Sequence, residues 1–516
     1  MACFRWVCAV LVAAMLAACA SAPIRPALPP PVQTALAAQP DTAFAPMEAA
    51  LQRAHGAQTS GFRLLDSNED GLRWRLTLID AARHTIDAQY YVWYGDTAGK
   101  LLLKRLLDAA DRGVRVRILV DDLTTLLRDA STVAIGDKPV ALLDAHPNLE
   151  IRLFNPWNNR ELLGRAGEAA TDLDRLNQRM HNKAMIVDNQ AAILGGRNIG
   201  SEYMGLDAHF NFHDLDVLGI GPVARQASAV FDRYWNSERV VQASALGQSG
   251  TEEGLVKLRG WLADDLAKKP ELARFPVAPT SWTGELAALP ADLKPGTSEV
   301  YSDLPEAGEI RHRMMDVMDG LAASARRELL VVNAYIIPGD KTIDMLRALK
   351  ANGVDIRVLT NSLASHDVPA VNSHYKRWRR QLVENTTALH EMRHDAAIQP
   401  GIVDTPPTQS GFVGLHSKGM VVDRERVYIG SMNFDPRSAA LNTEMGVVVT
   451  SPGLADDLVA VIRRDMQPAN SWRVALDADG SLTWTNDRET VTRQPARSWW
   501  QRVQDVIFMA FPKNLY

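Results

Sequence analysis

The stretch RMHNKAMIVD, residues 179–188, places a histidine, a lysine and an aspartate around a short apolar run. A second stretch, GLHSKGMVVD at residues 414–423, repeats that arrangement. Alternate side chains of an extended strand share a face, so the histidine and the lysine of each stretch are expected to point the same way. One match is typical of a buried strand with a polar end, whereas two matches indicate a functional pair.

The predicted secondary structure before each stretch is also repeated. Hydrophobic spacing predicts helix, strand, helix and strand, in that order, over residues 72–85, 86–94, 98–113 and 114–122. The same order recurs over residues 314–328, 329–337, 341–353 and 354–362. Alternation of helices and strands indicates the α/β fold class with parallel strands, and the repetition indicates an internal duplication.

Composition excludes several classes of protein. The chain has 516 residues, of which 46% are hydrophobic and 23% are charged, as in ordinary folded proteins. Its formal net charge of -5 lacks the basic excess of proteins that bind nucleic acid, so no nucleic-acid partner is expected. All three cysteines, Cys3, Cys8 and Cys19, lie near the N-terminus, so the body of the chain has no disulfide framework and no cysteine zinc site.

The N-terminal residues have the pattern of a secretory signal. One cation, Arg5, precedes an apolar stretch at residues 6–18, and small and proline-rich residues follow. LAAC at residues 16–19 resembles the lipobox of bacterial lipoproteins, which implies cleavage before Cys19 and lipidation of that cysteine. A plain signal peptide and an uncleaved anchor remain alternatives. The lipobox interpretation places the protein in the bacterial cell envelope, lipid-anchored on the periplasmic side of either the inner or the outer membrane.

These patterns divide the chain into six segments. We expect a signal peptide (1–18), a lipidated cysteine with a Pro/Ala-rich tether of little fixed structure (19–58), a first lobe (59–240), a connecting segment without a clear strand pattern (241–300), a second lobe (301–490), and a C-terminal amphipathic helix with a tail (491–516).

Two surface features are interpreted separately. The basic cluster at 374–382 is predicted to be a solvated helix face, with anionic lipid headgroups as the alternative contact. Near the C-terminus apolar residues recur at helical spacing, and such a stripe usually faces the core, with the membrane interface as the alternative. The residues of this stripe are Trp499, Trp500, Val503, Val506, Ile507 and Ala510.

A glycine-containing turn follows each histidine stretch. GGRN at residues 195–198 and GSMN at residues 430–433 allow close approach of the backbone, and Asn198 and Asn433 supply amide donors suited to phosphate oxygens. Phosphodiester chemistry needs cations, a nucleophile for phosphorus and an acid for the leaving alcohol. Paired histidines, lysines and asparagines supply all three. One imidazole has to start neutral and the other protonated.

No metal and no cofactor are expected. HEMRH at residues 390–394 matches the H-E-x-x-H zinc template, but that template requires a helix, and this stretch falls where a strand is expected.

The pattern H-x-K-x-x-x-x-D followed by G-[GS]-x-N, present twice, resembles that of the phospholipase D superfamily. The phrases SGFRLL, RLNQRMHNK, GGRNIGSEY, FHDLDVLGIGPV and TNSLASHDVPAVNSHY are most similar to bacterial cardiolipin synthases, in particular the C type. The resemblance implies two pseudo-symmetric phospholipase D-type lobes. Each is expected to be a mixed, mostly parallel sheet with helices on both faces, and one active site is expected where the lobes meet.

The resemblance also implies roles for individual residues. His181 is expected to be the nucleophile that becomes a phosphohistidine, and His416 the general acid that then acts as a base, although near-symmetry leaves these two roles interchangeable. Asp188 and Asp423 belong to the catalytic signature, with a more structural role as the alternative. The remaining implied residues are Lys183 and Lys418 as phosphate clamps, Asn198, Asn433 and Ser431 as phosphate ligands, and Asp214 and Glu444 as partners that orient the histidines. Gly196 in the first copy replaces Ser431 of the second, so the cradle is asymmetric.

The function implied is transfer of a phosphatidyl group to phosphatidylglycerol, with phosphatidylethanolamine as a possible donor and the membrane as the site of action. A phospholipase D that releases phosphatidic acid uses the same residues and remains an alternative. A lipid-anchored binding protein with a vestigial site is a more distant one, and a nuclease is disfavoured by the net charge. The oligomeric state is open, since a monomer suffices for a site made by two lobes.

Overall fold

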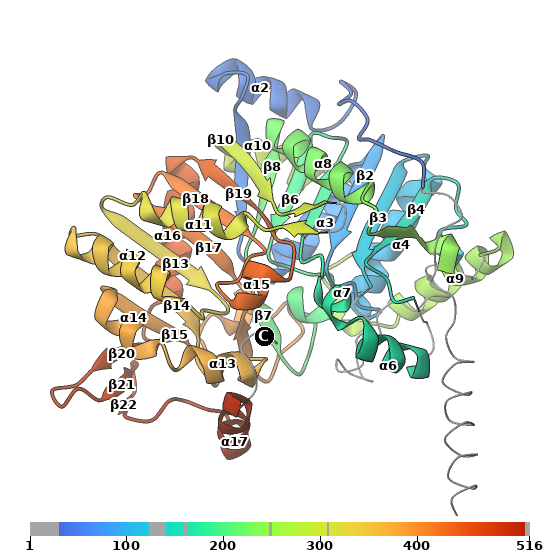
Figure 1. The fold of residues 1–516 in the computed structure, drawn as a ribbon. Coiled ribbons are helices and arrows are strands. Elements are labelled where there is room, and N and C mark those ends of the chain that lie inside the picture. Colours follow the sequence, from blue (N-terminus) through green and yellow to red (C-terminus); the bar gives the residue numbers. More distant parts are fainter. Residues whose placement is uncertain (1–29, 123–140, 159–161, 247–249, 307–308, 511–516) are drawn as a thin grey trace, which may run out of the picture.

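The computed structural model describes residues 30–122, 141–158, 162–246, 250–306 and 309–510. Two lobes built on the same plan lie side by side (Figure 1). The predictions of a signal peptide and of lipidation at Cys19 fall outside these ranges. No helix in the described ranges is long and apolar enough to cross a bilayer.

The predicted order of helices and strands is present in both halves of the chain. The elements of the first half are α2 Ala45–His55, β1 Ser60–Leu65, α3 Asn68–Ala81, β2 Thr85–Tyr90, α4 Thr97–Asp111, β3 Arg115–Asp121, β4 Leu149–Phe154, α6 Leu162–Thr171, α7 Leu173–Asn177, β5 Ala184–Val187, β6 Ala191–Gly195, η1 Ser201–Tyr203, β7 Asn211–His213, β8 Asp216–Ile220, α8 Pro222–Trp235, β9 Val240–Gln242, η2 Ala243–Leu246, α9 Glu252–Leu266, η3 Pro270–Leu272 and α10 Thr283–Asp292.

The second half repeats the plan and adds a C-terminal hairpin and helix. Its elements are β10 Lys294–Ser302, β11 Leu304–Pro305, β12 Ile310–Arg311, α11 Met314–Ala323, β13 Glu328–Asn333, α12 Asp340–Ala351, β14 Asp355–Asn361, α13 Pro369–Tyr375, α14 Arg379–Asn385, β15 Ala388–Met392, η4 Gln399–Val403, β16 Val413–Leu415, β17 Lys418–Val422, β18 Arg426–Gly430, α15 Pro436–Ala440, β19 Met445–Thr450, α16 Pro452–Asp465, β20 Ser471–Leu476, β21 Leu482–Thr485, β22 Thr490–Val491, α17 Trp499–Ile507 and η5 Phe508–Ala510.

Both lobes have the same strand order. The first lobe runs β9-β4-β3-β2-β5-β6-β8-β1, and the second runs β20-β15-β14-β13-β17-β18-β19-β10. Parallel pairing joins β2, β3 and β4 in one lobe and β13, β14 and β15 in the other, and the other pairings in these two sheets are antiparallel. The α/β class and the mixed sheets are confirmed, but the prediction of mostly parallel sheets is wrong.

Tight turns explain the antiparallel half of each sheet. The turn after β5 contains Asp188 and Asn189 with φ of 52° and 54°, and the turn after β17 contains Asp423 and Arg424 with φ of 55° and 59°. Two successive residues with positive φ reverse the chain with the twist that a hairpin requires. β5 therefore returns as β6 and β17 as β18, because parallel strands would need a long crossover in place of these turns.

β10 joins the two sheets into one. Its first residues pair with β1, and the residues from Thr297 to Ser302 pair with β19. It therefore occupies in the second lobe the place that β1 has in the first. The predicted connecting segment 241–300 is therefore too long at its end, because its last residues belong to β10. The second lobe begins at Lys294. The hydrophobic signal is weak because half-buried and exposed residues alternate along β10.

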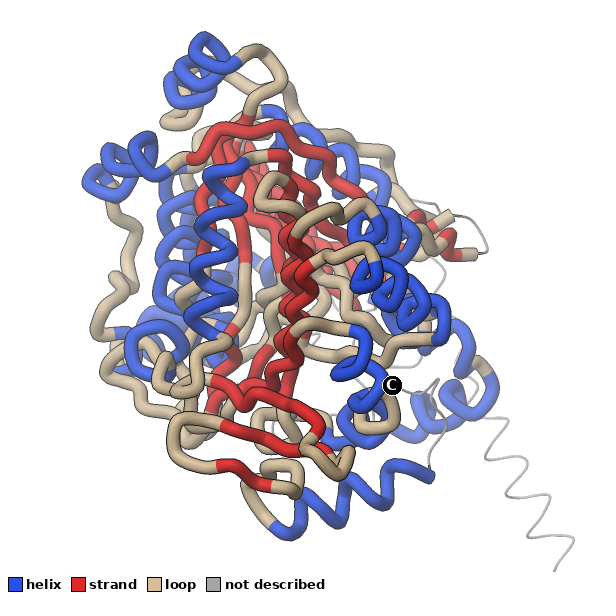
Figure 2. Tube along the Cα trace, turned by 90° about the vertical axis from the view of Figure 1, so that its left-hand side faces the viewer, coloured by secondary structure: helices blue, strands red, loops and turns tan. Residues whose placement is uncertain are grey.

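Each sheet is buried on both faces, with helices on either side (Figure 2). One core lies between α3, α4 and α9 and the first sheet, and another lies between α11, α12 and the second sheet. A third core contains apolar residues of α8 and α16 and is shared by the two lobes. Along β5, Ala184 and Ile186 enter the shared core while Met185 and Val187 enter the outer core of the first lobe. The shared core fixes how the lobes meet.

The segment before the first lobe is more ordered than predicted. The backbone N–H of Gln33 donates to Oδ1 of Asn236 at 3.0 Å, and that of Ala35 donates to Oδ2 of Asp232 at 2.7 Å. Helix α2 follows and Glu48 within it is buried. The prediction of little fixed structure over 19–58 is therefore wrong for residues 30–58, because their polar groups bind α8 and its C-terminal end.

Candidate active site

The two histidine stretches meet where short segments of one lobe pair with segments of the other. β7 pairs in parallel with β16, and Met180 forms a bridge with Thr443. The backbone N–H of His181 donates to the Thr443 carbonyl at 2.8 Å, and that of His416 donates to the His213 carbonyl at 2.8 Å. Each histidine is therefore held by the backbone of the opposite lobe.

The carboxylates that orient the imidazoles also come from the opposite lobe. Nδ1 of His181 lies 2.9 Å from Oε2 of Glu444, and Nδ1 of His416 lies 2.6 Å from Oδ2 of Asp214. A carboxylate at Nδ1 fixes the ring and leaves Nε2 to act on a substrate. The structure thus brings together the four predicted residues, in a crossed arrangement that their order in the sequence does not reveal.

Lys183 and Lys418 lie beside the histidines in matching conformations. Nζ of Lys183 donates to the His181 carbonyl at 2.7 Å, and Nζ of Lys418 donates to the His416 carbonyl. Both lysines are buried, and the charge of each acts on both histidines. The two histidines and the two lysines therefore form one electrostatic unit.

Burial and mutual repulsion lower the proton affinity of this unit. Burial and then the charges of Lys183 and Lys418 lower the pKa of His181 well below its ordinary value. The pKa of His416 is lowered to about 4 by burial and by Lys418, although Asp214 acts to raise it. Burial lowers the pKa of Lys418 to about 8. An anion bound among these groups would offset the repulsion, so the site is suited to a phosphate.

The two carboxylates differ in their protonation. Burial acts to raise the pKa of Asp214, but the charges of His416 and Lys418 and the hydrogen bond from His416 bring it below its ordinary value. Burial raises the pKa of Glu444 well above its ordinary value, with Lys183 opposing that rise. Asp214 is therefore ionised at neutral pH, whereas Glu444 takes up a proton more readily. The two histidines consequently have unequal partners.

Ser431 contacts a carboxylate instead of facing a phosphate. Its hydroxyl donates to Oε2 of Glu444 and accepts from the backbone N–H of Met445 at 3.1 Å. In the first lobe a Cβ added at Gly196 would lie 2.2 Å from Oδ1 of Asp214, so that position has no room for a serine. Ser431 therefore supports the carboxylate that holds His181, and its binding of phosphate stays a prediction.

Asn198 and Asn433 occupy equivalent places after β6 and β18. Oδ1 of Asn198 accepts from the backbone N–H of Val92 at 3.3 Å. Oδ1 of Asn433 has no hydrogen-bond partner among the described residues although it is buried. Both side chains are buried polar amides, and their binding of phosphate remains a prediction.

Asp188 and Asp423 are structural in this fold. The carboxylate of Asp188 accepts from the backbone N–H groups of Arg83, His84 and Thr85, the shortest of these hydrogen bonds being 2.7 Å. Asp423 accepts in the same way from residues 326–328. Each carboxylate fastens the start of a neighbouring strand to the tight turn. These contacts favour the structural alternative for both aspartates, and a catalytic role stays a prediction.

Aromatic rings that the sequence did not single out enclose the histidines. The ring of Tyr91 lies edge-on to His181 with centroids 4.7 Å apart, and Nζ of Lys183 lies 5.1 Å from the Tyr91 centroid. Tyr203 and Phe212 contact His416 at 5.2 and 5.0 Å. Their positions in the sequence could have indicated these two residues. Phe212 lies two residues before Asp214, and Tyr203 lies in the phrase that follows GGRN.

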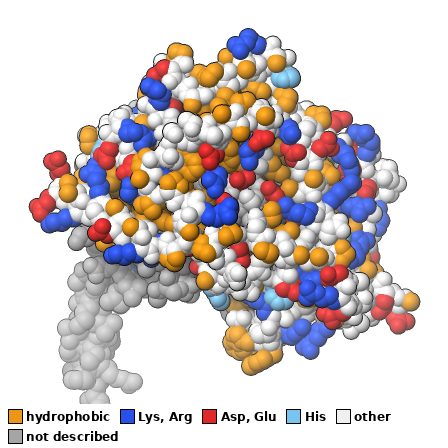
Figure 3. Space-filling model, turned by 180° about the vertical axis from the view of Figure 1, so that it is seen from behind, with side chains coloured by type: hydrophobic (Ala, Val, Ile, Leu, Met, Phe, Trp, Pro, Cys, Tyr) orange, Lys and Arg blue, Asp and Glu red, His pale blue; other side chains and the backbone are white. Residues whose placement is uncertain are grey.

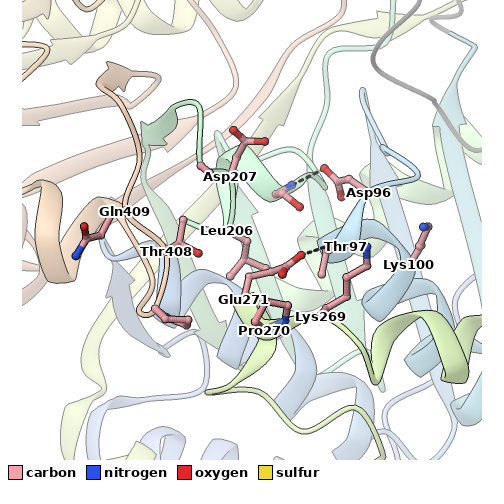
Figure 4. A pocket seen from close by; sticks show the side chains of 13 residues that line it. Asp96, Thr97, Lys100, Leu206, Asp207, Lys269, Pro270, Glu271, Thr408 and Gln409 are labelled. Atoms are coloured by element: carbon pink, nitrogen blue, oxygen red, sulfur yellow. Dashed lines mark hydrogen bonds between the residues drawn. The ribbon is translucent and has the colours of Figure 1, made fainter.

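Figure 4 shows a separate pocket of about 610 Å³ lined by residues of both lobes. None of the predicted site residues lines it. Two of its polar groups are engaged with other side chains, since Thr97 Oγ1 donates to Glu271 Oε1 at 2.7 Å and Lys100 Nζ lies 2.8 Å from Asp265 Oδ2. We therefore assign the chemistry to the histidine site.

The first three residues of HEMRH lie in strand β15, as predicted, and the last two follow the end of that strand. His390 is in the middle of β15 opposite Arg473 of β20, and its Nδ1 lies 3.2 Å from the hydroxyl of Ser471. The helical spacing on which the zinc template depends is therefore not present here. Within the described ranges no group of three or more His, Cys, Asp or Glu side chains is arranged to hold a metal ion.

Comparison with known proteins agrees with the geometry. A family model described as cardiolipin synthase, PLD-like domain, matches residues 76–235 and 320–466. Cardiolipin synthase C of Escherichia coli (strain K12) is 35% identical over 454 residues, covering 85% of this chain and 92% of that protein. Cardiolipin synthase A of Pseudomonas entomophila (strain L48) is 27% identical over 448 residues, covering 85% of this chain and 76% of that protein.

A solved structure supports the fold. The crystal structure of phosphatidylserine synthase from Haemophilus influenzae Rd KW20 matches with a TM-score of 0.55 and 14% identity, covering 81% of this chain and 91% of that one. The family match includes both histidine stretches and both carboxylates that pair with them. On this evidence the chain is an enzyme of the phospholipase D superfamily and belongs to its cardiolipin synthase family.

Proposed function

We propose that this protein is a phosphatidyltransferase that makes cardiolipin from a donor phospholipid and phosphatidylglycerol. The crossed pair of imidazoles carries the proposal, since each ring is held at Nδ1 by a buried carboxylate and lies beside a buried lysine. The cardiolipin synthases among the relatives support the choice of product.

In the first half-reaction Nε2 of neutral His181 attacks the donor phosphorus. The N–P bond forms while the bond from phosphorus to the oxygen of the headgroup alcohol breaks. His416, as imidazolium, gives its proton to that oxygen, and the lysines stabilise the charge that builds on the phosphate. The products are a phosphatidyl group on His181 and the free alcohol.

In the second half-reaction neutral His416 acts as a base. It takes the proton of the terminal hydroxyl of phosphatidylglycerol while the oxygen of that hydroxyl attacks phosphorus and the N–P bond breaks. Cardiolipin leaves, His181 is again neutral and His416 is again protonated. Phosphatidylethanolamine is a candidate donor because its headgroup can leave as an alcohol in the same way.

The electrostatics support His181 as the nucleophile. The largest influences on its pKa all act to lower it, namely burial followed by nearby cationic groups. Burial and Lys418 lower the pKa of His416 to about 4, but the charge and hydrogen bond of Asp214 act to raise it. His416 is therefore the imidazole whose partner favours protonation once a bound phosphate offsets the charges of the lysines. A neutral His181 and a protonated His416 are the pair that the first step requires.

Product analysis tests the proposal. The purified full-length protein is incubated in mixed micelles with labelled phosphatidylglycerol, with and without phosphatidylethanolamine, and the lipids are separated. Labelled cardiolipin is expected, and a His181→Asn variant should form neither cardiolipin nor a covalent lipid adduct. Phosphatidic acid without cardiolipin would establish a phospholipase D instead, and the absence of any product would favour the vestigial binding protein.

We also propose that the chain is lipid-anchored through Cys19 on the periplasmic side of the cell envelope. The support is the LAAC stretch and the preceding apolar segment. Metabolic labelling with a fatty acid should mark the protein, and Cys19→Ala should abolish the label. Retention of the label in that variant would reject the proposal.

A further inference from the structure

Helix α17 packs on the second lobe through its polar face. Gln501 and Asp505 are the buried residues of this helix. Asp505 accepts hydrogen bonds from Asn372 Nδ2 at 2.7 Å and from Lys376 Nζ at 2.6 Å, and Gln501 donates to the carbonyl of Leu363. An ion pair with a buried carboxylate, together with these hydrogen bonds, fixes the rotation of the helix about its axis.

The apolar face of α17 consequently points outward. Trp499 is 74% exposed, Trp500 51%, Val506 63% and Ile507 50%. Figure 3 shows hydrophobic side chains gathered on the projection at the lower edge of the molecule, where α17 lies in Figure 1. The prediction that this stripe faces the core is wrong for these four residues. Their exposure reverses the usual arrangement, in which an amphipathic helix of a globular protein buries its apolar face. An exposed patch of this kind marks an interaction surface.

The charges around this face are cationic. Arg493 and Arg497 are exposed, and Asp505, the acidic residue of the helix, is paired with Lys376. Arg493 and Arg502 line a hollow of about 640 Å³ together with Trp499, Val503, Val506 and Ile507. Burial lowers the pKa of Arg502, and repulsion from Arg493 lowers it further, so the two guanidinium groups converge on one place. An anionic group next to an apolar surface fits this hollow.

The same segment is mounted beside the active site. The guanidinium of Arg497 lies 3.4 Å from the centroid of the Phe412 ring, and its Nη2 donates to the His366 carbonyl at 3.5 Å. The charge of Asp367, the next residue, acts on both Arg497 and the active-site Lys418. A surface held by α17 is therefore tied, through residues 366 and 367, to the lysine of the second histidine stretch.

The neighbouring basic cluster at 374–382 is partly structural. Arg379 is buried and its Nε lies 2.6 Å from Oε1 of Glu391, while Lys376 is the partner of Asp505. The prediction that the cluster is a solvated helix face is therefore wrong for Arg379, which is buried in its ion pair, and Lys376 is half-buried against Asp505. Arg377 remains exposed beside α17, since its Nη2 donates to the carbonyl of Met509 at 3.0 Å.

We infer that the outward face of α17 is a membrane-docking surface for a bilayer that contains anionic phospholipid. Trp499 and Trp500 lie at the level of the headgroups, the aliphatic residues enter the acyl boundary, and the arginines bind lipid phosphates. Apolar residues alone would be enough to bind a second protein. Tryptophans next to arginines are typical of a surface that binds lipid. Binding of this face to a bilayer does not depend on whether the enzyme turns over. Only the benefit of that binding to catalysis rests on the proposed function.

A site-specific probe tests the docking. All native cysteines lie within the first 19 residues, so the full-length chain with Cys3, Cys8 and Cys19 replaced by serine accepts one label. An environment-sensitive fluorophore is attached at Val506→Cys or, as the matched control, at Trp261→Cys on α9, where Trp261 is 52% exposed. Vesicles of phosphatidylglycerol and phosphatidylethanolamine should shift the emission to the blue and allow quenching by spin-labelled lipid at 506 and not at 261.

Function gives a second readout. The variant Trp499→Gln/Trp500→Gln should lower the ratio of turnover on vesicles to turnover in detergent micelles by at least about tenfold. The reason is that the binding energy between α17 and the vesicle comes from buried apolar area. Trp261→Gln should leave that ratio unchanged. Failure of the proposed reaction would leave the fluorescence result intact, so the two failures are distinguishable.

Three results would overturn the inference. The first is equal emission at 506 with and without anionic vesicles. The second is a blue shift at 506 that depends on protein concentration without lipid, which would assign the face to a second copy of the chain. The third is a shift of equal size in vesicles of phosphatidylcholine alone, which would remove the role of the arginines.

Discussion

Nδ1 of His181 lies 2.9 Å from Oε2 of Glu444, although the two residues are 263 positions apart in the chain and belong to different lobes. His416 and Asp214 repeat the relationship in the opposite direction at 2.6 Å. Each lobe thus supplies the histidine of one pair and the carboxylate of the other. Neither lobe contains a complete pair, so the site exists only where the two sheets dock.

Replacement of one carboxylic side chain of a crossed pair by its amide should slow the chemistry more than it weakens substrate binding. We expect Asp214→Asn and Glu444→Gln to lower kcat by about a hundredfold, within the usual range for acid–base catalysis, with KM changed much less. Glu425→Gln is the matched control, because that side chain is exposed in the second lobe. Steady-state kinetics in mixed micelles measure the effect, and a near-normal kcat in either variant would contradict the assigned roles.

The activity should fall in alkaline solution. Burial lowers the pKa of Lys418 to about 8, so this lysine loses its positive charge as pH rises through that region. Burial also lowers the pKa of Lys183 well below its ordinary value. We expect kcat/KM, which reports the free enzyme, to fall above about pH 8. Lys418→Arg should move this alkaline fall of kcat/KM to a pH at least about one unit higher, because the guanidinium group remains charged. A fall at unchanged pH would argue against Lys418, and the exposed Lys341→Arg serves as control.

A methyl group at Gly196 should disturb the site without touching the substrate. The added Cβ would lie 2.2 Å from Oδ1 of Asp214, so the carboxylate has to move away from His416. We expect Gly196→Ala to lower kcat at least about tenfold. Gly260→Ala is the control, since its Cβ meets nothing within 4 Å and alanine stabilises a helix interior by up to about 1 kcal/mol. Wild-type kinetics of Gly196→Ala would show that Asp214 need not be held in place.

Asp188 should matter for stability more than for chemistry. Its carboxylate accepts hydrogen bonds from three backbone N–H groups at residues 83–85. Asp188→Ala leaves buried donors without partners, which costs about 1 to 3 kcal/mol, and Asp188→Asn should cost less because one oxygen remains. Denaturant unfolding measures the change. Turnover per folded molecule should stay within about threefold, and a larger loss at unchanged stability would return Asp188 to the catalytic group.

The parts of the fold that could be predicted are those with strong periodicity. Residues 72–122 and 314–362 form buried elements whose hydrophobic spacing is regular, and their order is as predicted. The ends differ, as in α3, which begins after Ser67 because the Ser67 hydroxyl accepts from the Asp70 N–H at 3.1 Å. Strand β10 was missed because alternate residues along it are only half-buried. Helix α2 was missed because it follows proline-rich sequence.

The sequence by itself determined the duplication and the α/β class, and it predicted the histidines, lysines and carboxylates that the structure brings together. Only the tertiary structure decided that His181 pairs with Glu444 and His416 with Asp214, that Ser431 supports Glu444, and that α17 packs by its polar face. The reason is physical. Periodicity reports which side of a local element is apolar, whereas contacts between residues more than 200 positions apart depend on how the two sheets dock across their shared core.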